Sequence, residues 1–170
     1  HFQVNTRTGD ASAGAVAQTG NSQFGTDFLV IKNRDQADEW KNLNRIRTAT
    51  KELNWDSQAV ESTDANGVTA FSASDGYTVG TGAGGYNDTG ESFIDYHWKA
   101  DGTTGASNTD GTITSTVSTN DTAGFSYGKY TGNGTDGATV GHGNVGTPTF
   151  GYVKRVDNTT TRSWLAKFPG

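Results

Sequence analysis

Apolar and polar residues alternate with a period of two over several short segments, a pattern typical of β-strands with one buried face. The clearest alternation covers residues 92–100, SFIDYHWKA, where Ile94, Tyr96 and Trp98 share one side. Phe93, Asp95, His97 and Lys99 share the other side, which carries three ionisable groups. We therefore expect the first set to face the core.

Other segments carry the same signal or a dense apolar run. The expected strands cover residues 2–8, 28–31, 67–72, 77–80, 112–118, 125–131 and 150–153. Residues 112–118, TITSTVS, are polar enough for an exposed face or an edge. From the apolar run and the alternation we expect a core that contains Phe28, Val30, Ile94, Tyr96 and Trp98.

One segment departs from the strand pattern. Residues 38–53 place Trp40, Leu43 and Ile46 at intervals close to those of a helix, although the spacing then drifts before Leu53. We expect one short helical or irregular excursion here.

The chain contains an internal repeat at an offset of 123 residues. Residues 2–21 align with residues 125–144, and after a one-residue gap Phe28 and Lys32 face Phe150 and Lys154. We interpret residues 1–104 as a first β unit and residues 105–170 as a second, partial unit that repeats the start of the first. The two blocks, residues 2–35 and 125–157, should form superposable hairpin-like units. As an alternative, the second block closes one sandwich together with the first.

Composition supports an all-β fold. Thr, Ser, Asn and Gly supply 76 of the 170 residues, while 18 aromatic residues are enough to seed a thin core. Threonine favours strands and glycine suits tight turns. We predict an antiparallel β-sandwich, for which a jelly-roll or concanavalin-like arrangement is one option.

Charge and residue usage argue against several functions. The net charge is −5 and the basic residues form no continuous stripe, so nucleic-acid binding is disfavoured. No apolar run approaches the roughly 18 residues of a membrane helix, so we expect no membrane insertion. Cysteine is absent, which excludes disulfides and thiolate chemistry. His1, His97 and His142 lie in no triad-like motif, so we predict no enzymatic activity.

Two binding hypotheses remain. Sugars stack on exposed aromatic rings, and Trp40, Trp55 and Tyr86 fall in expected loops or in the excursion, so these three are the candidate glycan-binding residues. Asp75, Asp101, Asp110 and Asp136 each precede glycine and could offer oxygen ligands to calcium, but turn formation explains them better. We predict no required cofactor.

Several blocks, in order, resemble an uncharacterised Gly/Thr-rich β-domain family of marine bacteriophage structural proteins. The blocks are DFLVIKNRD, IRTATKEL, STDANGVTAFSASDGYTVGT and SFIDYHWKA, followed by TGNGTDGATVGHGNVG, and together they span most of residues 2–157. The chain departs from the family pattern at Thr48, where glycine is commoner, and at residues 150–153, which are less aliphatic. The resemblance implies a context in tail fibres and other virion appendages.

The resulting hypothesis is a non-enzymatic structural and adhesion module of a phage tail fibre or other virion appendage. Its expected partners are further copies of itself, a neighbouring virion protein, or a host surface polysaccharide. A cellular extracellular carbohydrate-binding or surface-layer module is the alternative, and a depolymerase is a third reading with less support.

Overall fold

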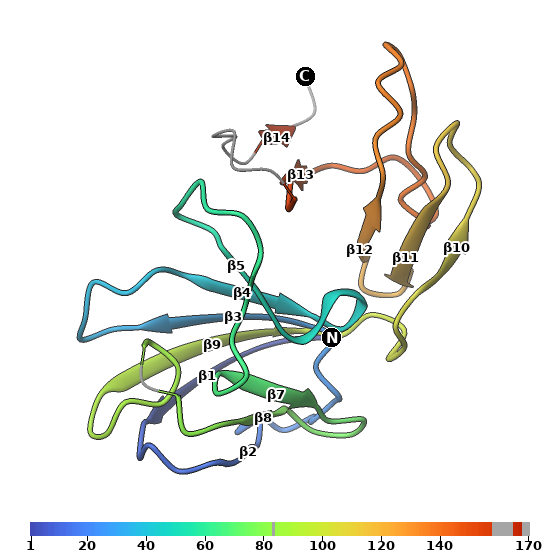
Figure 1. The fold of residues 1–170 in the computed structure, drawn as a ribbon. Helices are drawn as coiled ribbons and strands as arrows, with labels where there is room; N and C mark the ends of the chain where they lie inside the picture. Colours follow the sequence, from blue (N-terminus) through green and yellow to red (C-terminus); the bar gives the residue numbers. More distant parts are fainter. Residues whose placement is uncertain (83, 158–164, 168–170) are drawn as a thin grey trace.

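The computed structural model describes residues 1–82, 84–157 and 165–167 (Figure 1). In these residues the secondary structure consists of strands and one 3-10 helix, η1 (Arg45–Arg47). The strands are β1 (Phe2–Thr8), β2 (Gly14–Val16), β3 (Phe28–Asn33), β4 (Lys41–Asn44), β5 (Thr48–Asn54), β6 (Ser62–Thr63), β7 (Val68–Phe71), β8 (Tyr77–Val79), β9 (Ser92–Trp98), β10 (Ala106–Asn108), β11 (Ser115–Asn120), β12 (Phe125–Tyr130), β13 (Gly151–Val153) and β14 (Leu165–Lys167). The all-β prediction is confirmed.

Two sheets pack face to face and form a sandwich. The larger sheet has six strands in the order β1-β9-β3-β4-β5-β6, and the smaller has three in the order β2-β8-β7 (Figure 1). All of the strand pairs within them are antiparallel. The predicted antiparallel β-sandwich is therefore present, and its strands all lie within residues 2–98.

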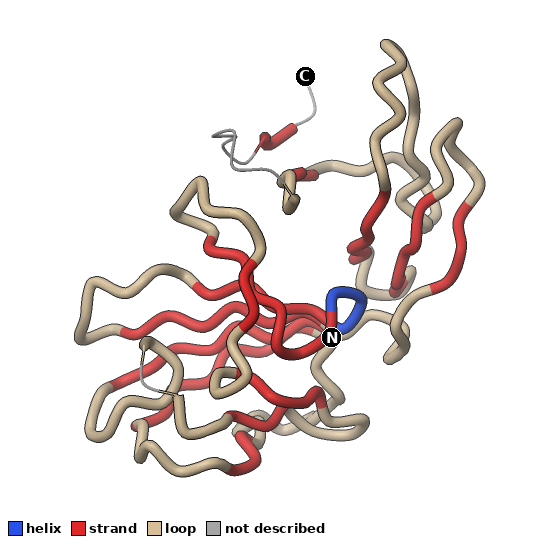
Figure 2. Tube along the Cα trace, viewed as in Figure 1, coloured by secondary structure: helices blue, strands red, loops and turns tan. Residues whose placement is uncertain are grey.

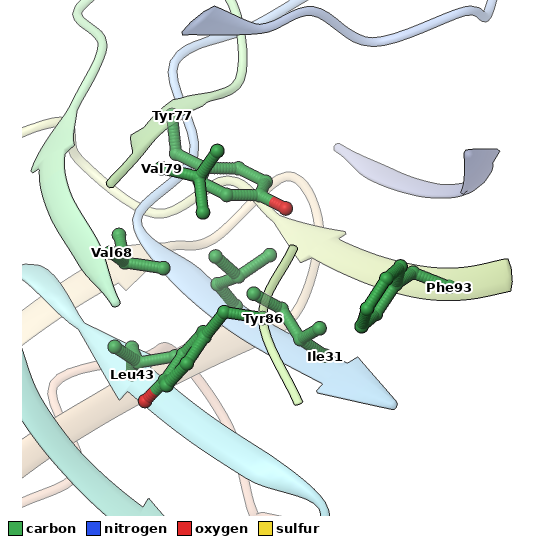
Figure 3. Packing of buried hydrophobic residues seen from close by; sticks show 8 residues of the cluster. Ile31, Leu43, Val68, Tyr77, Val79, Tyr86 and Phe93 are labelled. Atoms are coloured by element: carbon green, nitrogen blue, oxygen red, sulfur yellow. The ribbon is translucent and has the colours of Figure 1, made fainter. Parts of the chain in front are cut away.

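The core lies between these two sheets (Figure 3). The large sheet contributes Leu29, Ile31, Leu43 and Phe93, and the small sheet contributes Val68, Tyr77 and Val79, while Tyr86 enters from the connection between β8 and β9. Burying large apolar side chains of this kind contributes about 1.5–3 kcal/mol each. The sandwich therefore has an apolar centre despite its polar composition.

Strand β9 is oriented opposite to our expectation. Phe93, Asp95 and His97 are fully buried in the sandwich, whereas Ile94, Tyr96 and Trp98 are half-buried on the other face of the sheet. The prediction of which β9 residues form the core was wrong for these six positions. The reason is that Asp95 and His97 have buried polar partners, so the more polar side of β9 can face inward.

The predicted excursion is mostly strand. Residues 41–44 form β4 and residues 48–54 form β5, and only η1 between them is helical. Asn44 caps η1 because its side chain accepts a hydrogen bond from the Arg47 amide. The near-helical spacing that suggested a longer helix comes from this tight turn between two paired strands.

The C-terminal part forms two further small sheets (Figure 2). One has the order β10-β11-β12, and the other pairs β13 with β14. The hairpin-like units expected for the repeated blocks do not form, because β1 and β3 both pair with β9 while β12 and β13 lie in separate sheets. Equivalent residues still start strands, since β1 begins at Phe2 and β12 at Phe125. None of the described helical residues forms a segment that could cross a membrane.

Candidate functional site

The outer face of the six-stranded sheet, which we call the aromatic face, is lined by ring side chains. Strand register explains this, because Phe2, Trp98 and Phe28 occupy one row across β1, β9 and β3. Val4, Tyr96 and Val30 occupy the next row on the same side. Alternation along three neighbouring strands thus gathers apolar and aromatic residues on one surface.

Four rings on this face form a connected series. Trp40 stacks on Tyr96 with ring centroids 6.1 Å apart and an interplanar angle of 28°. Tyr96 in turn stacks on Trp98 at 6.3 Å and 27°, and Phe2 lies 4.9 Å from Trp98. Trp40, Tyr96 and Trp98 are all half-buried, so part of each ring faces solvent. The series is a platform on which a flat apolar ligand surface could stack.

Strand β12, from the C-terminal part of the chain, covers one end of the aromatic face. Phe125 stacks on Trp98 at 6.1 Å, and both Phe125 and Tyr127 contact Phe28, at 5.8 and 5.7 Å. At the β1 edge the face is open, because Phe2 is 53% exposed and Val4 is 42% exposed. The surface available to a partner therefore lies along β1 and the adjoining part of β9.

The three candidate glycan-binding residues are not brought together. Trp40 lies on the aromatic face beside Tyr96. Trp55 is half-buried between Phe28 and Tyr152, with ring centroids 6.2 and 5.6 Å away. Tyr86 is only 1% exposed, and its hydroxyl donates a hydrogen bond to Glu52 in the interior. The expectation that Tyr86 is available for a sugar was wrong, because a loop residue can supply a core side chain.

Sequence reasoning missed Tyr96 and Trp98 as surface residues. Both were assigned to the core because they alternate with more polar neighbours. Three separate strand segments each carry an aromatic residue that falls in the same row of the sheet: Phe2, Phe28 and Trp98. This recurrence of aromatic residues is the signal that could have placed them together on one outer face.

The inner face of the same sheet holds a buried polar network. Arg7 Nε lies 2.9 Å from Asp95 Oδ2, and the Tyr77 hydroxyl donates to the same oxygen at 2.9 Å. Burial raises the pKa of Asp95, and the positive charge of Arg7 opposes that rise. Burial, followed by the nearby Asp95 charge, also raises the pKa of Tyr77 well above its ordinary value. Tyr77 therefore keeps the proton that it donates, and the Asp95 carboxylate accepts hydrogen bonds from both Tyr77 and Arg7.

A polar depression of about 290 Å³ lies between β1 and β2, beside this network. Arg7, Asp10 and Asn87 are among its lining residues. The Arg7 guanidinium donates to Asp95, to the Asn87 side chain and to the Tyr86 carbonyl oxygen, so its donors are committed to the fold. The geometry gives Arg7 a structural role rather than that of an anion receptor.

One group of carboxylates in the described residues could ligate a hard cation. Ligand atoms of Asp38, Asp88 and Glu91 all lie within 4.8 Å of one another. Asn33 Nδ2 donates to both Asp38 and Glu91, and the Gly85 amide donates to Asp88. The aspartates considered for calcium lie elsewhere. Asp75 accepts a long-range hydrogen bond from the Gln18 backbone amide, and Asp101 accepts a local one from the Thr103 backbone amide.

Comparison with known proteins yields one match. A family model described as "Domain of unknown function (DUF7483)" matches residues 1–168. Neither the curated proteins nor the solved structures include a match to this chain.

Proposed function

The chain belongs to the DUF7483 domain family, and we propose that it is a non-enzymatic structural and adhesion module of a phage tail fibre or another virion appendage. The ordered sequence blocks that resemble marine phage structural proteins support the virion context. The aromatic face supports the adhesion role, and it is the observation on which the proposal rests.

The physical argument concerns exposed apolar surface. A soluble domain rarely leaves large apolar side chains exposed together unless the patch contacts a partner. Here Phe2 and Val4 are 53% and 42% exposed, directly beside the half-buried rings of Tyr96 and Trp98. Aromatic rings are favoured at binding surfaces because they bury a large area with little loss of conformational freedom.

Within this role we propose that host surface polysaccharide stacks on Trp40 and Tyr96. The two rings stack at 28° to each other and both residues are half-buried, so part of the stacked pair is available to the apolar face of a sugar ring. Replacing Trp40 with Ala should weaken polysaccharide binding at least about tenfold, whereas Trp40→Phe should keep most of it because a ring remains.

The binding experiment is affinity electrophoresis of the purified chain through gels that contain polysaccharides from candidate hosts. Retardation that Trp40→Ala removes and Trp40→Phe retains supports the glycan role. Equal retardation of all three proteins, or no retardation in any gel, contradicts it.

The virion context has its own test. Antibodies raised against the chain should label the appendages of phage particles in electron micrographs. Labelling of bacterial cell surfaces in the absence of particles would instead favour a cellular carbohydrate-binding or surface-layer module.

Self-association belongs to the same proposal. We expect the chain to pack against further copies of itself or against a neighbouring virion protein through its C-terminal region. Phe150, Val153 and Leu165 are 52%, 39% and 68% exposed there, so apolar surface is available for such contacts. Sedimentation at micromolar concentration should reveal association, and a clean monomer would contradict this part of the proposal.

A further inference from the structure

Strand β1 is an edge strand with hydrogen-bonding groups that face outward. The Lys99 amide donates to the His1 carbonyl oxygen and the Gly9 amide donates to the Glu91 carbonyl oxygen, so odd-numbered residues of β1 bond to β9. In an antiparallel ladder the intervening residues point the other way. The backbone groups of Val4 and Thr6 therefore face the free edge, where no strand of the described chain pairs with them.

Strand β12 is the counterpart of β1 in the internal repeat. At the offset of 123 residues, Phe125 corresponds to Phe2 and Tyr127 to Val4. β12 pairs with β11, with Ser118 opposite Tyr127 and Val117 opposite Gly128. The edges of the two strands can therefore be compared residue by residue.

Strand β11 pairs with one edge of β12. The corresponding edge of β1 has no partner strand among the described residues. A Cβ atom placed on Gly128 would lie 3.5 Å from the Val117 Cα, which fits the close, non-hydrogen-bonded type of antiparallel pair. The neighbouring pair, Ser118 with Tyr127, is then the hydrogen-bonded type. Tyr127 thus directs its backbone groups toward β11, as its counterpart Val4 directs its own toward the free edge.

The side chains show the same correspondence. Phe125 and Tyr127 pack on Phe28, and Phe125 also stacks on Trp98, so β12 is seated on the aromatic face of this unit. Their counterparts Phe2 and Val4 are 53% and 42% exposed. The side chains of β12 that pack on the aromatic face thus have counterparts in β1 that are exposed to solvent.

We infer that β1 docks on a second unit of this domain in the way that β12 docks on this one. In that second unit β1 takes the place that β12 holds in this one, so it pairs with a strand like Ser115–Asn120 and rests Phe2 and Val4 on the aromatic face of the second unit. The contact joins unlike surfaces, so repetition produces a linear array rather than a closed dimer. The inference deepens the proposed structural role by naming the partner and the edge, and it does not require glycan binding.

The test supplies the missing strands in cis. A second copy of residues 105–124 is placed directly before Phe2 in the full chain, in place of His1, which reproduces the native connection between β11 and β12. Tethering gives the added strand a high effective concentration. Hydrogen exchange at the amides of Val4 and Thr6 should slow at least about tenfold. The amides of Gln3 and Asn5, which already bond to β9, should change little.

The matched control carries Thr116→Pro and Ser118→Pro in the added copy only, because proline cannot donate to the ladder. This control should leave the exchange of Val4 and Thr6 unchanged. Slowing in both extended chains, or in neither, overturns the inference. Binding of polysaccharide and labelling of particles are measured separately, so failure here is distinguishable from failure of the proposed function.

Discussion

Arg7 and Asp95 form an ion pair inside the sandwich, with Nε and Oδ2 2.9 Å apart and the Asp95 side chain fully buried. The two residues lie on neighbouring strands, β1 and β9. Tyr77 completes the arrangement from the small sheet with a hydrogen bond to the same carboxylate oxygen. The pair therefore links the edge strand β1, its neighbour β9 and the opposite sheet.

Removing the cation alone should be costly. Arg7→Met leaves the buried Asp95 carboxylate without its counter-charge, and breaking a buried pair in this way costs about 3–5 kcal/mol. Urea unfolding followed by circular dichroism measures the loss. Adding Asp95→Asn to Arg7→Met removes the unpaired charge and should recover part of the stability. A loss below about 1 kcal/mol for Arg7→Met would mean that the pair behaves like an exposed one.

The orientation of β9 leads to a second prediction. Phe93 is fully buried in the core and its neighbour Ile94 is half-buried on the outer face. Phe93→Ala should therefore cost about 3–5 kcal/mol of unfolding free energy. Ile94→Ala should cost about half as much or less, because less apolar area leaves water on folding. Equal losses in thermal unfolding, or a larger loss for Ile94→Ala, would contradict the assignment of the two faces.

The sequence predicts the strands far better than it predicts their faces. Alternation in residues 92–100 identifies β9 and separates its two sides, but it does not state which side the small sheet covers. Asp95 and His97 resemble surface residues in the sequence because no polar partner lies near them along the chain. The partner of Asp95, Arg7, is 88 residues away, and the partner of His97, Thr26, is 71 residues away. Partners at such distances depend on the sheet order, which local patterns do not encode.

The candidate site was predictable only in part. Trp40 is half-buried on the aromatic face, beside Tyr96. Tyr86 lies in a connection between strands, as its Gly-rich surroundings suggest. Its ring nevertheless fills the core, because its hydroxyl group can donate a hydrogen bond to Glu52 there. The sequence also favours a core position for Trp164, which lies outside the described residues. Residue type and local context thus identify a turn without fixing the burial of its side chain.

A glycine in the turn between β7 and β8 of the small sheet offers a third test. Gly76 has a φ of +57°, and a Cβ atom there would lie 1.9 Å from the Val16 carbonyl oxygen. Gly76→Ala should cost at least about 2 kcal/mol, since the left-handed conformation is strained for alanine and β2 must move. Gly132→Ala is the control, because a Cβ atom there meets nothing within 4 Å. Similar melting temperatures for the two variants would show that β2 shifts without cost.

His97 predicts how stability depends on pH. Its side chain is fully buried, and Nδ1 lies 2.8 Å from the Thr26 hydroxyl oxygen. Burial lowers the pKa of His97 to about 4, whereas an unfolded histidine has a pKa of about 6.5. Between these values the unfolded chain binds a proton that the folded chain excludes. The stability contributed by the neutral ring is therefore complete above pH about 6.5 and is lost as the pH falls toward 4.

The size of the effect follows from the separation of the two pKa values. The free energy of unfolding should fall by about 3 kcal/mol between pH 7 and pH 4 through His97 alone. His97→Asn keeps a polar group near Thr26 but does not titrate, so its unfolding free energy, measured in urea at each pH, should fall by about 3 kcal/mol less than that of the unaltered chain. His142→Asn, which changes a histidine outside the sandwich, should keep the full dependence. If His97→Asn loses stability with falling pH as steeply as the unaltered chain, the buried ring is not the group that responds to acid.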